Sequence, residues 1–420
     1  MNRRLRDDCF ALPPGVEWTP VDTALSLLRE RLTSVTATED VPIGEAAGRI
    51  LASPAKARRA NPPAANAAVD GYAFAWASLK GRDVGDLPLE PGRSAAGHPF
   101  GREVPEGHAL RILTGAEIPA GADTVVLQED AEVRVGRVRF QAPRKQGANC
   151  RGFGEDAQEG DIVLAAGIRL GPGEIARLVS VGIDRVEVHK PLRVALISTG
   201  DELLQPGASP DSPGIFDANR PMLSAMVRAF GHSVVDVGAQ SDRAATVRTA
   251  LDRAAAEADA ILTTGGASSG DEDHVSRLLR DEGRMTSWRI AMKPGRPLAL
   301  GLWQGVPVFG LPGNPVAAFV TSLVFARPAL GALAGLGWQS ARGFMLPAAF
   351  EKTKKAGRRE YLRARLTDDG RVEVFASEGS GLIGGLSWSD GLVELPDEAL
   401  TVKPGDPVRY VPHASSGFGV

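Results

Sequence analysis

The sequence has few cysteines and no large excess of charge of either sign. Only Cys9 and Cys150 occur among its 420 residues, which is too few for a disulfide framework and fits no zinc or redox spacing. Lys plus Arg (48) nearly balance Asp plus Glu (51), giving a net charge of −3, so the basic excess typical of nucleic-acid or anionic-membrane binding is lacking. We therefore expect a reducing compartment and neither nucleic acid nor membrane as a partner.

Long apolar segments are lacking as well. Residues 1–10 contain arginines but are followed by Pro13-Pro14-Gly15 rather than an apolar stretch, which argues against a secretory signal. No apolar run reaches the ~18 residues of a membrane-spanning helix, so we expect a cytoplasmic protein. Hydrophobic residues make up 43% of the chain and charged residues 24%, as in ordinary folded proteins. A length of 420 residues predicts two or more domains.

The pattern of short apolar runs predicts a multidomain α/β protein with additional β-rich domains. Residues 189–337 alternate strand-like and helical runs, which indicates a central doubly wound, mostly parallel sheet with ligands at the carboxyl ends of its strands. Residues 51–147 predict an inserted β-rich lobe, and residues 338–420 predict a small β-rich C-terminal domain. Residues 1–50 and 148–188 remain, and we expect them to form one discontinuous linking domain that contains helices.

Two helices are expected in that linking domain. Thr19 and Pro20 resemble the N-cap and first residue of a helix, and Asp22 then lies near the positive end of its dipole. A second helix is predicted at residues 173–182. We expect the two helices to pack side by side.

A glycine-rich segment follows one predicted strand of the central domain. Residues 265–273 read Gly-Gly-Ala-Ser-Ser-Gly-Asp-Glu-Asp. Consecutive glycines uncover backbone N–H groups, and a following helix adds its positive end, so the segment is typical of a phosphate cradle. A tight turn alone accounts for Gly265 and Gly266 but not for Ser268, Ser269 and the three acids beside them.

The same segment also matches the nucleophile elbow Gly-x-Ser-x-Gly of serine hydrolases, with Ser268 as the nucleophile. The sequence has no His-Gly-Gly-Gly oxyanion segment. The histidines after Ser268 are His274, which is too close in sequence, and His413, near the C-terminus. A serine hydrolase is therefore the less favoured interpretation.

Acidic residues follow a second strand of the central domain. Glu202 and Asp273 are expected at equivalent strand ends, where two carboxylates can share a hard cation such as Mg²⁺. In the alternative interpretation, Asp201 or Glu202 only caps the next turn.

Basic residues gather near a loop stiffened by proline and glycine. Arg289, Lys293 and Arg296 are suited to phosphate or oxyanion binding because the loop restricts their positions. Pro312 and Asn314 then open a long helix, whose N-terminus is directed at the same end of the sheet.

Taken together, these motifs resemble, in order and over nearly the whole chain, the molybdopterin molybdenumtransferase family, whose eukaryotic relative is the C-terminal domain of gephyrin. The matching segments are residues 70–73 (Asp-Gly-Tyr-Ala), 114–116 (Thr-Gly-Ala), 154–156 (Gly-Glu-Asp), 198–203 (Ser-Thr-Gly-Asp-Glu-Leu), 265–266 (Gly-Gly), 293–295 (Lys-Pro-Gly) and 312–315 (Pro-Gly-Asn-Pro).

The resemblance implies an elongated homodimer of four-domain chains, with a third domain similar to molybdopterin adenylyltransferase. It implies a Mg²⁺-dependent transferase that inserts molybdate into adenylylated molybdopterin and releases AMP to form molybdenum cofactor. The adenylyltransferase and proteins that mature molybdoenzymes are the implied partners. A non-catalytic scaffold on the same fold is the alternative, which the acids at Asp70, Glu202 and Asp273 disfavour.

The resemblance also implies roles for individual residues. Glu202, Asp242 and Asp273 correspond to metal ligands, and Arg289 and Lys293 to substrate-binding bases. The implied catalytic residues are Asp70, Thr114, Glu202, Asp273 and Lys293. The implied substrate-binding residues are Gly265, Gly266, Ser268, Ser269, Arg289, Lys293, Arg296, Pro312, Asn314, Arg363 and Ser380, of which Arg363 and Ser380 would bind molybdate. We expect Asp70 of one subunit to face Asp273 of the other.

Overall fold

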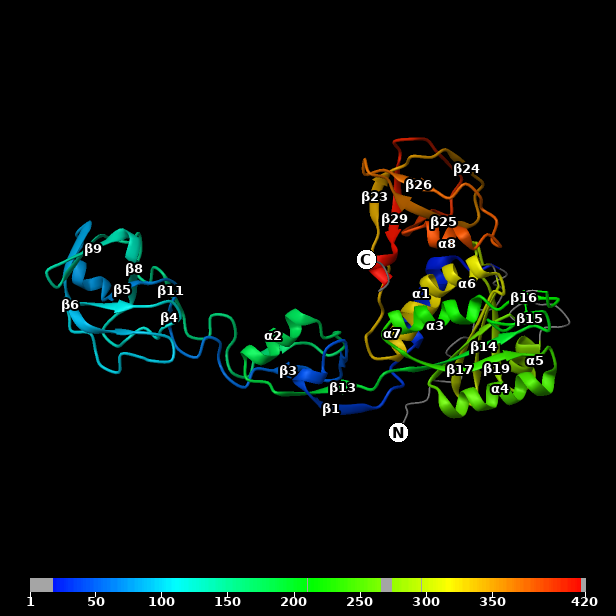
Figure 1. The fold of residues 1–420 in the computed structure, drawn as a ribbon, viewed down its shortest axis with the longest axis horizontal. Coiled ribbons are helices and arrows are strands. Elements are labelled where there is room, and N and C mark those ends of the chain that lie inside the picture. The colour runs from blue at the N-terminus through cyan, green and yellow to red at the C-terminus, as the bar shows by residue number, and fades with distance from the viewer. Residues whose placement is uncertain (1–17, 210, 266–273, 296, 417–420) are drawn as a thin grey trace.

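The computed structural model describes residues 18–209, 211–265, 274–295 and 297–416. The chain is elongated (Figure 1), with a β-rich lobe at one end and an α/β domain with the C-terminal domain at the other. A slender connecting region joins the two ends. The multidomain α/β fold with additional β-rich domains is thus confirmed, while the exact domain boundaries stay a prediction.

The α/β domain is built on a six-stranded sheet of order β17-β14-β18-β22-β21-β19. The first four strands of that order are parallel, and the last two pair antiparallel. The strands are β14 (Arg193–Thr199), β17 (Ser233–Gln240), β18 (Ala260–Thr264), β19 (Arg284–Arg289), β21 (Pro297–Trp303) and β22 (Val306–Leu311). β18 and β22 are buried along nearly their whole length, as expected for strands covered on both faces.

Helices cover both faces of this sheet. One buried apolar cluster joins the sheet to α3, α6 and α7, and a second joins it to α4 and α5. The helices are α3 (Asn219–Ala229), α4 (Ala244–Glu257), α5 (His274–Asp281), α6 (Pro315–Thr321) and α7 (Arg327–Leu333), with the π-helical turn η4 (Ser322–Ala326) between the last two. A short pair of strands, β15 (Leu203–Leu204) and β16 (Ile215–Phe216), follows β14. The predicted doubly wound domain is confirmed.

The opening helix α1 (Val21–Arg31) does not pack beside α2 (Pro172–Ser180), so that prediction is wrong. The apolar stripe Val21, Ala24 and Leu28 is fully buried in the α/β core, whereas α2 belongs to a separate cluster. The helix is placed there by the residue before it: Thr19 N–H donates to the Arg289 carbonyl oxygen at 2.8 Å. The Thr19 carbonyl oxygen accepts from Ala291 N–H at 2.9 Å, so the first helical hydrogen bond goes to the Pro20 carbonyl, and Pro20 rather than Thr19 is the N-cap.

The connecting region and the β-rich lobe are made mostly of short strands. The connecting region holds β1 (Thr38–Pro42), η1 (Ile43–Glu45), β2 (Ile50–Leu51), β3 (Ala55–Lys56), β12 (Ile162–Leu164), α2 and β13 (Arg185–His189). The lobe holds β4 (Asn66–Ala67), β5 (Gly71–Phe74), η2 (Trp76–Leu79), β6 (Val84–Ser94), β7 (Ala109–Ile112), β8 (Thr124–Leu127), η3 (Gln128–Asp130), β9 (Ala131–Arg134), β10 (Arg137–Gln141) and β11 (Cys150–Arg151). The lobe has its own apolar core around Phe74, Leu87 and Phe140.

The C-terminal domain is a β sheet that one segment of the α/β domain joins. Its sheet has the order β20-β25-β27-β29-β23, and β20 (Met292–Lys293) comes from the α/β part of the chain. The other elements are β23 (Phe344–Pro347), β24 (Lys352–Lys354), β25 (Arg359–Leu366), β26 (Val372–Val374), α8 (Gly384–Trp388), β27 (Gly391–Leu395), β28 (Leu400–Val402), β29 (Pro407–Pro412) and η5 (His413–Ser416). The pairing of β20 with β25 fixes Lys293 at the junction of the two domains.

One helical stretch is longer and more apolar than the sequence pattern predicts. Pro315–Leu333 spans 19 residues with a mean hydropathy of 1.7, which by length and composition alone would suffice to cross a membrane. However, 89% of its most apolar window is buried inside the protein. It therefore packs as a core helix.

Candidate functional site

Three loops meet at the carboxyl ends of the parallel strands β14, β18 and β22. A Cβ atom on Gly265 would lie 2.6 Å from the Thr199 carbonyl oxygen, and one on Gly313 would lie 3.6 Å from the Gly265 Cα. Gly265 also has a φ of +84°, where a side chain is strained. The backbones approach so closely that glycine is required at Gly265. The first glycine of the predicted cradle therefore sits where the doubly wound fold binds ligands.

Asn219, the first residue of α3, ties two of these strand ends together. Its side-chain Nδ2 donates to the Thr264 hydroxyl and to the Gly313 carbonyl oxygen, both at 2.7 Å. The side chain is buried, with 9% of its surface exposed. Asn219 was not predicted as a site residue, because an asparagine near a helix start resembles a cap and gives no sign of partners 45 and 94 residues away.

Carboxylates lie beside the cradle on two neighbouring loops. Glu202 is exposed and follows β14, and Asp242 is half-buried and follows β17. Burial raises the pKa of Asp242, and the negative charges of Asp201 and Glu202 raise it further. Asp201 accepts a hydrogen bond from the Asp242 backbone N–H at 3.0 Å, so it positions the loop that carries Asp242.

Glu202 and Asp242 fit Mg²⁺, which is commonly bound by one or two protein carboxylates together with waters and substrate phosphates. Among the described residues, no group of three or more His, Cys, Asp or Glu side chains is arranged to hold a metal ion. The third predicted ligand, Asp273, lies outside the described residues, as do Gly266, Ser268, Ser269 and Arg296.

Lys293 forms a chain of alternating charges with the C-terminal domain. Its Nζ donates to Glu378 at 2.5 Å, and Glu378 also pairs with Lys352. Lys352 in turn lies 3.1 Å from the buried carboxylate of Glu360. The two lysines hold the pKa of Glu378 below its usual range, so that it stays ionised. Glu378, Lys352 and Glu360 were not predicted, because each is a single charged residue that belongs to no recognisable sequence motif.

A cavity of about 280 Å³ lies beside this charge network. Lys293, Lys352 and Arg363 line it, together with Glu378. Arg363 is only 4% exposed, and its guanidinium donates to the carbonyl oxygens of Ser377, Leu382 and Gly379 at 2.5, 2.6 and 3.2 Å. Arg363 therefore organises the loop that carries Glu378, and burial lowers the pKa of its guanidinium.

Ser380 belongs to the same loop and touches the long helix. Its carbonyl oxygen accepts from Val316 N–H at 3.4 Å, and the same N–H donates to the side chain of Asn314 at 3.2 Å. Asn314 is the N-cap of α6, the start of the long helix that the sequence predicts, and Pro312 precedes it as a buried residue. Arg289 is exposed at the end of β19. Arg363 and Ser380 thus lie in one loop against the α6 N-terminus.

Asp70 and Thr114 form a separate pair in the β lobe. The Thr114 backbone N–H and hydroxyl both donate to Asp70 Oδ1, each at 2.7 Å. The hydroxyl bond and then the backbone bond lower the pKa of Asp70. The lobe strands β4 and β5 next to this pair lie at the opposite end of the chain from β14 and β18 (Figure 1). A single chain therefore keeps Asp70 and Glu202 apart.

The fold and these residues define an α/β protein whose glycine loops meet at the carboxyl ends of parallel strands, where folds of this class bind their ligands. Sequence profiles of known families match nearly the whole chain. They are the "MoeA N-terminal region (domain I and II)" at residues 19–182, the "Probable molybdopterin binding domain" at 195–332 and the "MoeA C-terminal region (domain IV)" at 346–413.

Whole proteins agree with these profiles. The molybdopterin molybdenumtransferase of Haemophilus influenzae is 35% identical over 399 residues, covering 93% of this chain and 98% of that protein. The enzyme of the same name from Nostoc is 33% identical over 385 residues, covering 87% of this chain and 86% of that protein. The chain therefore belongs to the molybdopterin molybdenumtransferase (MoeA) family, a family of transferases.

A solved structure agrees in shape. The molybdopterin biosynthesis moeA protein of Pyrococcus horikoshii superimposes with a TM-score of 0.81 at 28% identity, covering 94% of this chain and all of that one. The resemblance stated from the motifs is thus confirmed, and a serine hydrolase built on Ser268 has no support from these relatives.

Proposed function

We propose that this chain inserts molybdate into adenylylated molybdopterin, releasing AMP and forming molybdenum cofactor in the cytoplasm. The observation that carries the proposal is the meeting of the Thr199, Gly265 and Gly313 loops beside the carboxylates of Glu202 and Asp242. Such a site combines close backbone approach, which suits phosphate, with acids that suit a phosphate-bound cation. The family membership supplies the substrate class.

The residues of the site have distinct roles in this reaction. The backbone around Gly265 and the bases Arg289 and Lys293 bind the anionic substrate. Glu202, Asp242 and Asp273 would hold Mg²⁺, which neutralises charge on the phosphoanhydride oxygens when it is bound. Asp242 is half-buried among other acids, which favours a nearby cation over three uncompensated charges.

Molybdate enters this proposal at the junction of the α/β and C-terminal domains. The cavity beside Lys293 and Lys352 offers two ammonium groups for a tetrahedral dianion, next to the Ser380 loop and the positive end of α6. Because Arg363 already donates to three carbonyl oxygens, it acts in this proposal by holding the loop in place.

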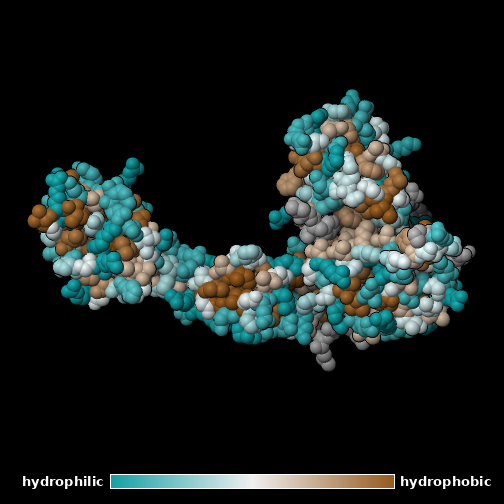
Figure 2. Space-filling model, in the orientation of Figure 1, coloured by the Kyte–Doolittle hydropathy of each residue, from teal (hydrophilic) through white to brown (hydrophobic). Residues whose placement is uncertain are grey.

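We place the complete site between two subunits of a homodimer, with Asp70 of one chain facing the α/β domain of the other. The separation of the β lobe from the α/β domain within one chain supports this arrangement. An apolar patch over the connecting region near α2 supports a dimer (Figure 2). There Ile162 on β12 and Val179 on α2 are 61% and 53% exposed. Molybdopterin adenylyltransferase and molybdoenzyme-maturation proteins are the proposed transient partners.

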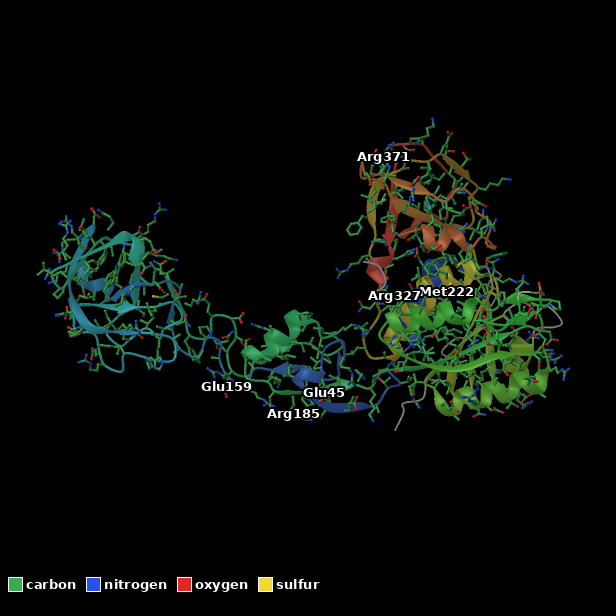
Figure 3. The ribbon with its side chains drawn as sticks, viewed as in Figure 1. Glu45, Glu159, Arg185, Met222, Arg327 and Arg371 are labelled. Carbon is green, nitrogen blue, oxygen red and sulfur yellow. The ribbon has the colours of Figure 1, made fainter. Side chains whose placement is uncertain are left out.

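The test is AMP release from adenylylated molybdopterin by the purified full chain. We expect release to require molybdate together with Mg²⁺, and to fall by at least a hundredfold in Glu202→Gln. The matched control is Glu159→Gln, an exposed acid of the connecting region (Figure 3). Release that proceeds at the same rate without molybdate would contradict the proposal.

A further inference from the structure

A second cavity lies away from the site described above, where the connecting region, the α/β domain and the C-terminal end of the described chain meet. Its volume is about 560 Å³. Arg169 reaches it from the connecting region, His232 from the turn between α3 and β17, and Arg327 from the start of α7. Figure 3 labels Arg327 at this junction. None of the described residues that line the cavity is acidic.

The Arg169 guanidinium is held firmly in this cavity. It donates to the carbonyl oxygens of Gly48 at 2.9 Å and Phe230 at 2.8 Å. A Cβ atom on Gly231 would lie 2.3 Å from Arg169 Nη1, and Gly231 has a φ of +85°. The positive φ favours glycine at this position, and a side chain there would displace the guanidinium from its present place. Carbonyl groups orient this cation but do not neutralise its charge.

Arg327 and His232 bring further polar atoms to the cavity without a carboxylate. Arg327 donates through Nη2 to the Ser415 carbonyl oxygen at 2.7 Å, while its buried Nη1 has no hydrogen-bond partner in the described part of the chain. His232 is 6% exposed, and its Nδ1 is buried without a partner in the same part. An unpaired buried N–H such as that of Arg327 Nη1 is costly. His232 Nδ1 can donate or accept, depending on which ring nitrogen carries the proton.

The electrostatics show the same deficit of negative charge. Burial lowers the pKa of Arg327, and the positive charge of Arg169 lowers it further. Burial also lowers the pKa of Arg169. For His232, burial and then the charge of Arg169 lower the pKa to about 4. Two half-buried guanidinium groups that repel each other are stabilised by an anion between them.

We propose that this cavity binds a tetrahedral oxyanion of the phosphate class, held by Arg169, Arg327 and a His232 ring nitrogen. Guanidinium groups present planar sets of N–H donors that match phosphate oxygens. Binding sites for small molecules commonly have volumes of about 300 to 1,000 Å³, so the space also admits a phosphate monoester. The ligand would join three parts of the chain at the point where the elongated arm meets the α/β domain.

The test is calorimetric titration of the full chain at neutral pH and low salt with two probes, inorganic phosphate and glycerol 3-phosphate. We expect Arg327→Gln to weaken binding of phosphate at least tenfold. Arg228→Gln removes an exposed charge from the neighbouring helix α3 and should leave the affinity within twofold. Lys293→Ala should do the same, which separates this site from the one proposed for molybdate. The stronger of the two probes identifies the source of the phosphate group.

Thermal unfolding separates ligand binding from a structural role of Arg327. In phosphate-free buffer Arg327→Gln should unfold at the wild-type temperature or above it, because its charge no longer repels Arg169. Added phosphate should raise the midpoint of the wild type but not that of the variant. His232→Phe, which keeps a ring and removes both nitrogens, should weaken phosphate binding as well. Wild-type phosphate affinity in both variants, or no binding by the wild type, would overturn the proposal.

Discussion

Asp70 Oδ1 accepts two hydrogen bonds from Thr114, one from the backbone N–H and one from the hydroxyl, each 2.7 Å long. The pair joins the start of β5 to the turn after β7 in the β lobe. Because Thr114 supplies both bonds, it fixes the direction of a carboxylate that is otherwise in contact with water. Thr114 therefore acts as a positioning residue for Asp70.

Thr114→Val should lower AMP release about tenfold to a hundredfold, because a misdirected carboxylate loses most of its effect. The variant keeps the backbone bond and loses the hydroxyl bond, which is the larger cause of the lowered Asp70 pKa. The acidic limb of the pH–rate profile should therefore move to higher pH. Thr114→Ser restores the hydroxyl and should restore both rate and profile. An unchanged profile in Thr114→Val would show that this bond does not tune Asp70.

Lys293→Ala should raise the KM for the anionic substrate at least tenfold and leave the folded state almost as stable. The Lys293 and Glu378 side chains are 39% and 44% exposed, and an ion pair so exposed contributes only about 0 to 1 kcal/mol. Lys403→Ala is the control, since Lys403 is an exposed lysine of the same C-terminal domain. Steady-state kinetics and thermal unfolding of both variants measure the effect. Equal KM values in the two variants would show that Lys293 does not bind the substrate and is an ordinary surface lysine.

Asn219→Ala should destabilise the protein by about 1 to 3 kcal/mol, because it removes the donor that satisfies the Gly313 carbonyl and the Thr264 hydroxyl. Activity should fall with it, since Gly313 is part of the cradle. Denaturant unfolding of Asn219→Ala beside Arg228→Ala, an exposed position on the same helix, measures the difference. Equal stability of the two variants would show that the bridge between the strand ends is not needed.

The elements of the α/β domain were predictable because their signals are local. Strands such as β18 are continuous apolar runs that end at glycine, and α6 begins with an Asn-Pro pair that caps it. The position of α1 was not predictable. Its apolar stripe fits either neighbouring core, and the backbone bond from Thr19 to Arg289 decides between them across 270 residues of sequence.

Individual residues of the candidate site could be predicted only where they belong to a motif contained within a single loop. Gly265 and Lys293 were identified because glycine and proline surround them. Asn219 and Glu378 were missed, since each acts through partners that only the folded chain brings near. A lone asparagine or glutamate carries no periodic or spacing signal. Tertiary pairing, such as that of β20 with β25, creates the remaining part of the site.

Stability should fall as the pH drops from about 6.5 to about 4 in phosphate-free buffer. Burial lowers the pKa of both His232 and His413 from 6.5 to about 4. The unfolded chain then binds protons more tightly in this window, so each histidine contributes stability that is present above pH 6.5 and is lost on acidification, up to about 3 kcal/mol each. Around His232 the charged neighbours are Arg169 and Arg327, and Asp390 partly opposes the shift of His413.

Urea unfolding at several pH values checks this prediction. His232→Phe removes one of the two titrating groups and should flatten the decline between pH 6.5 and 5, whereas His98→Phe, an exposed position in the β lobe, should not. The same slope in both variants would show that His232 is not buried in its neutral form.

The most direct test of the account is complementation between two inactive chains. One chain carries Asp70→Ala in the β lobe, and the other carries Glu202→Ala in the α/β domain. If each site is built from both subunits, a mixed dimer has one doubly damaged site and one intact site. Random mixing gives half mixed dimers, so co-expression should restore molybdate-dependent AMP release to roughly a quarter of the wild-type value. Activity that stays at the level of the separate variants, in preparations where mixed dimers are demonstrated, would contradict the account.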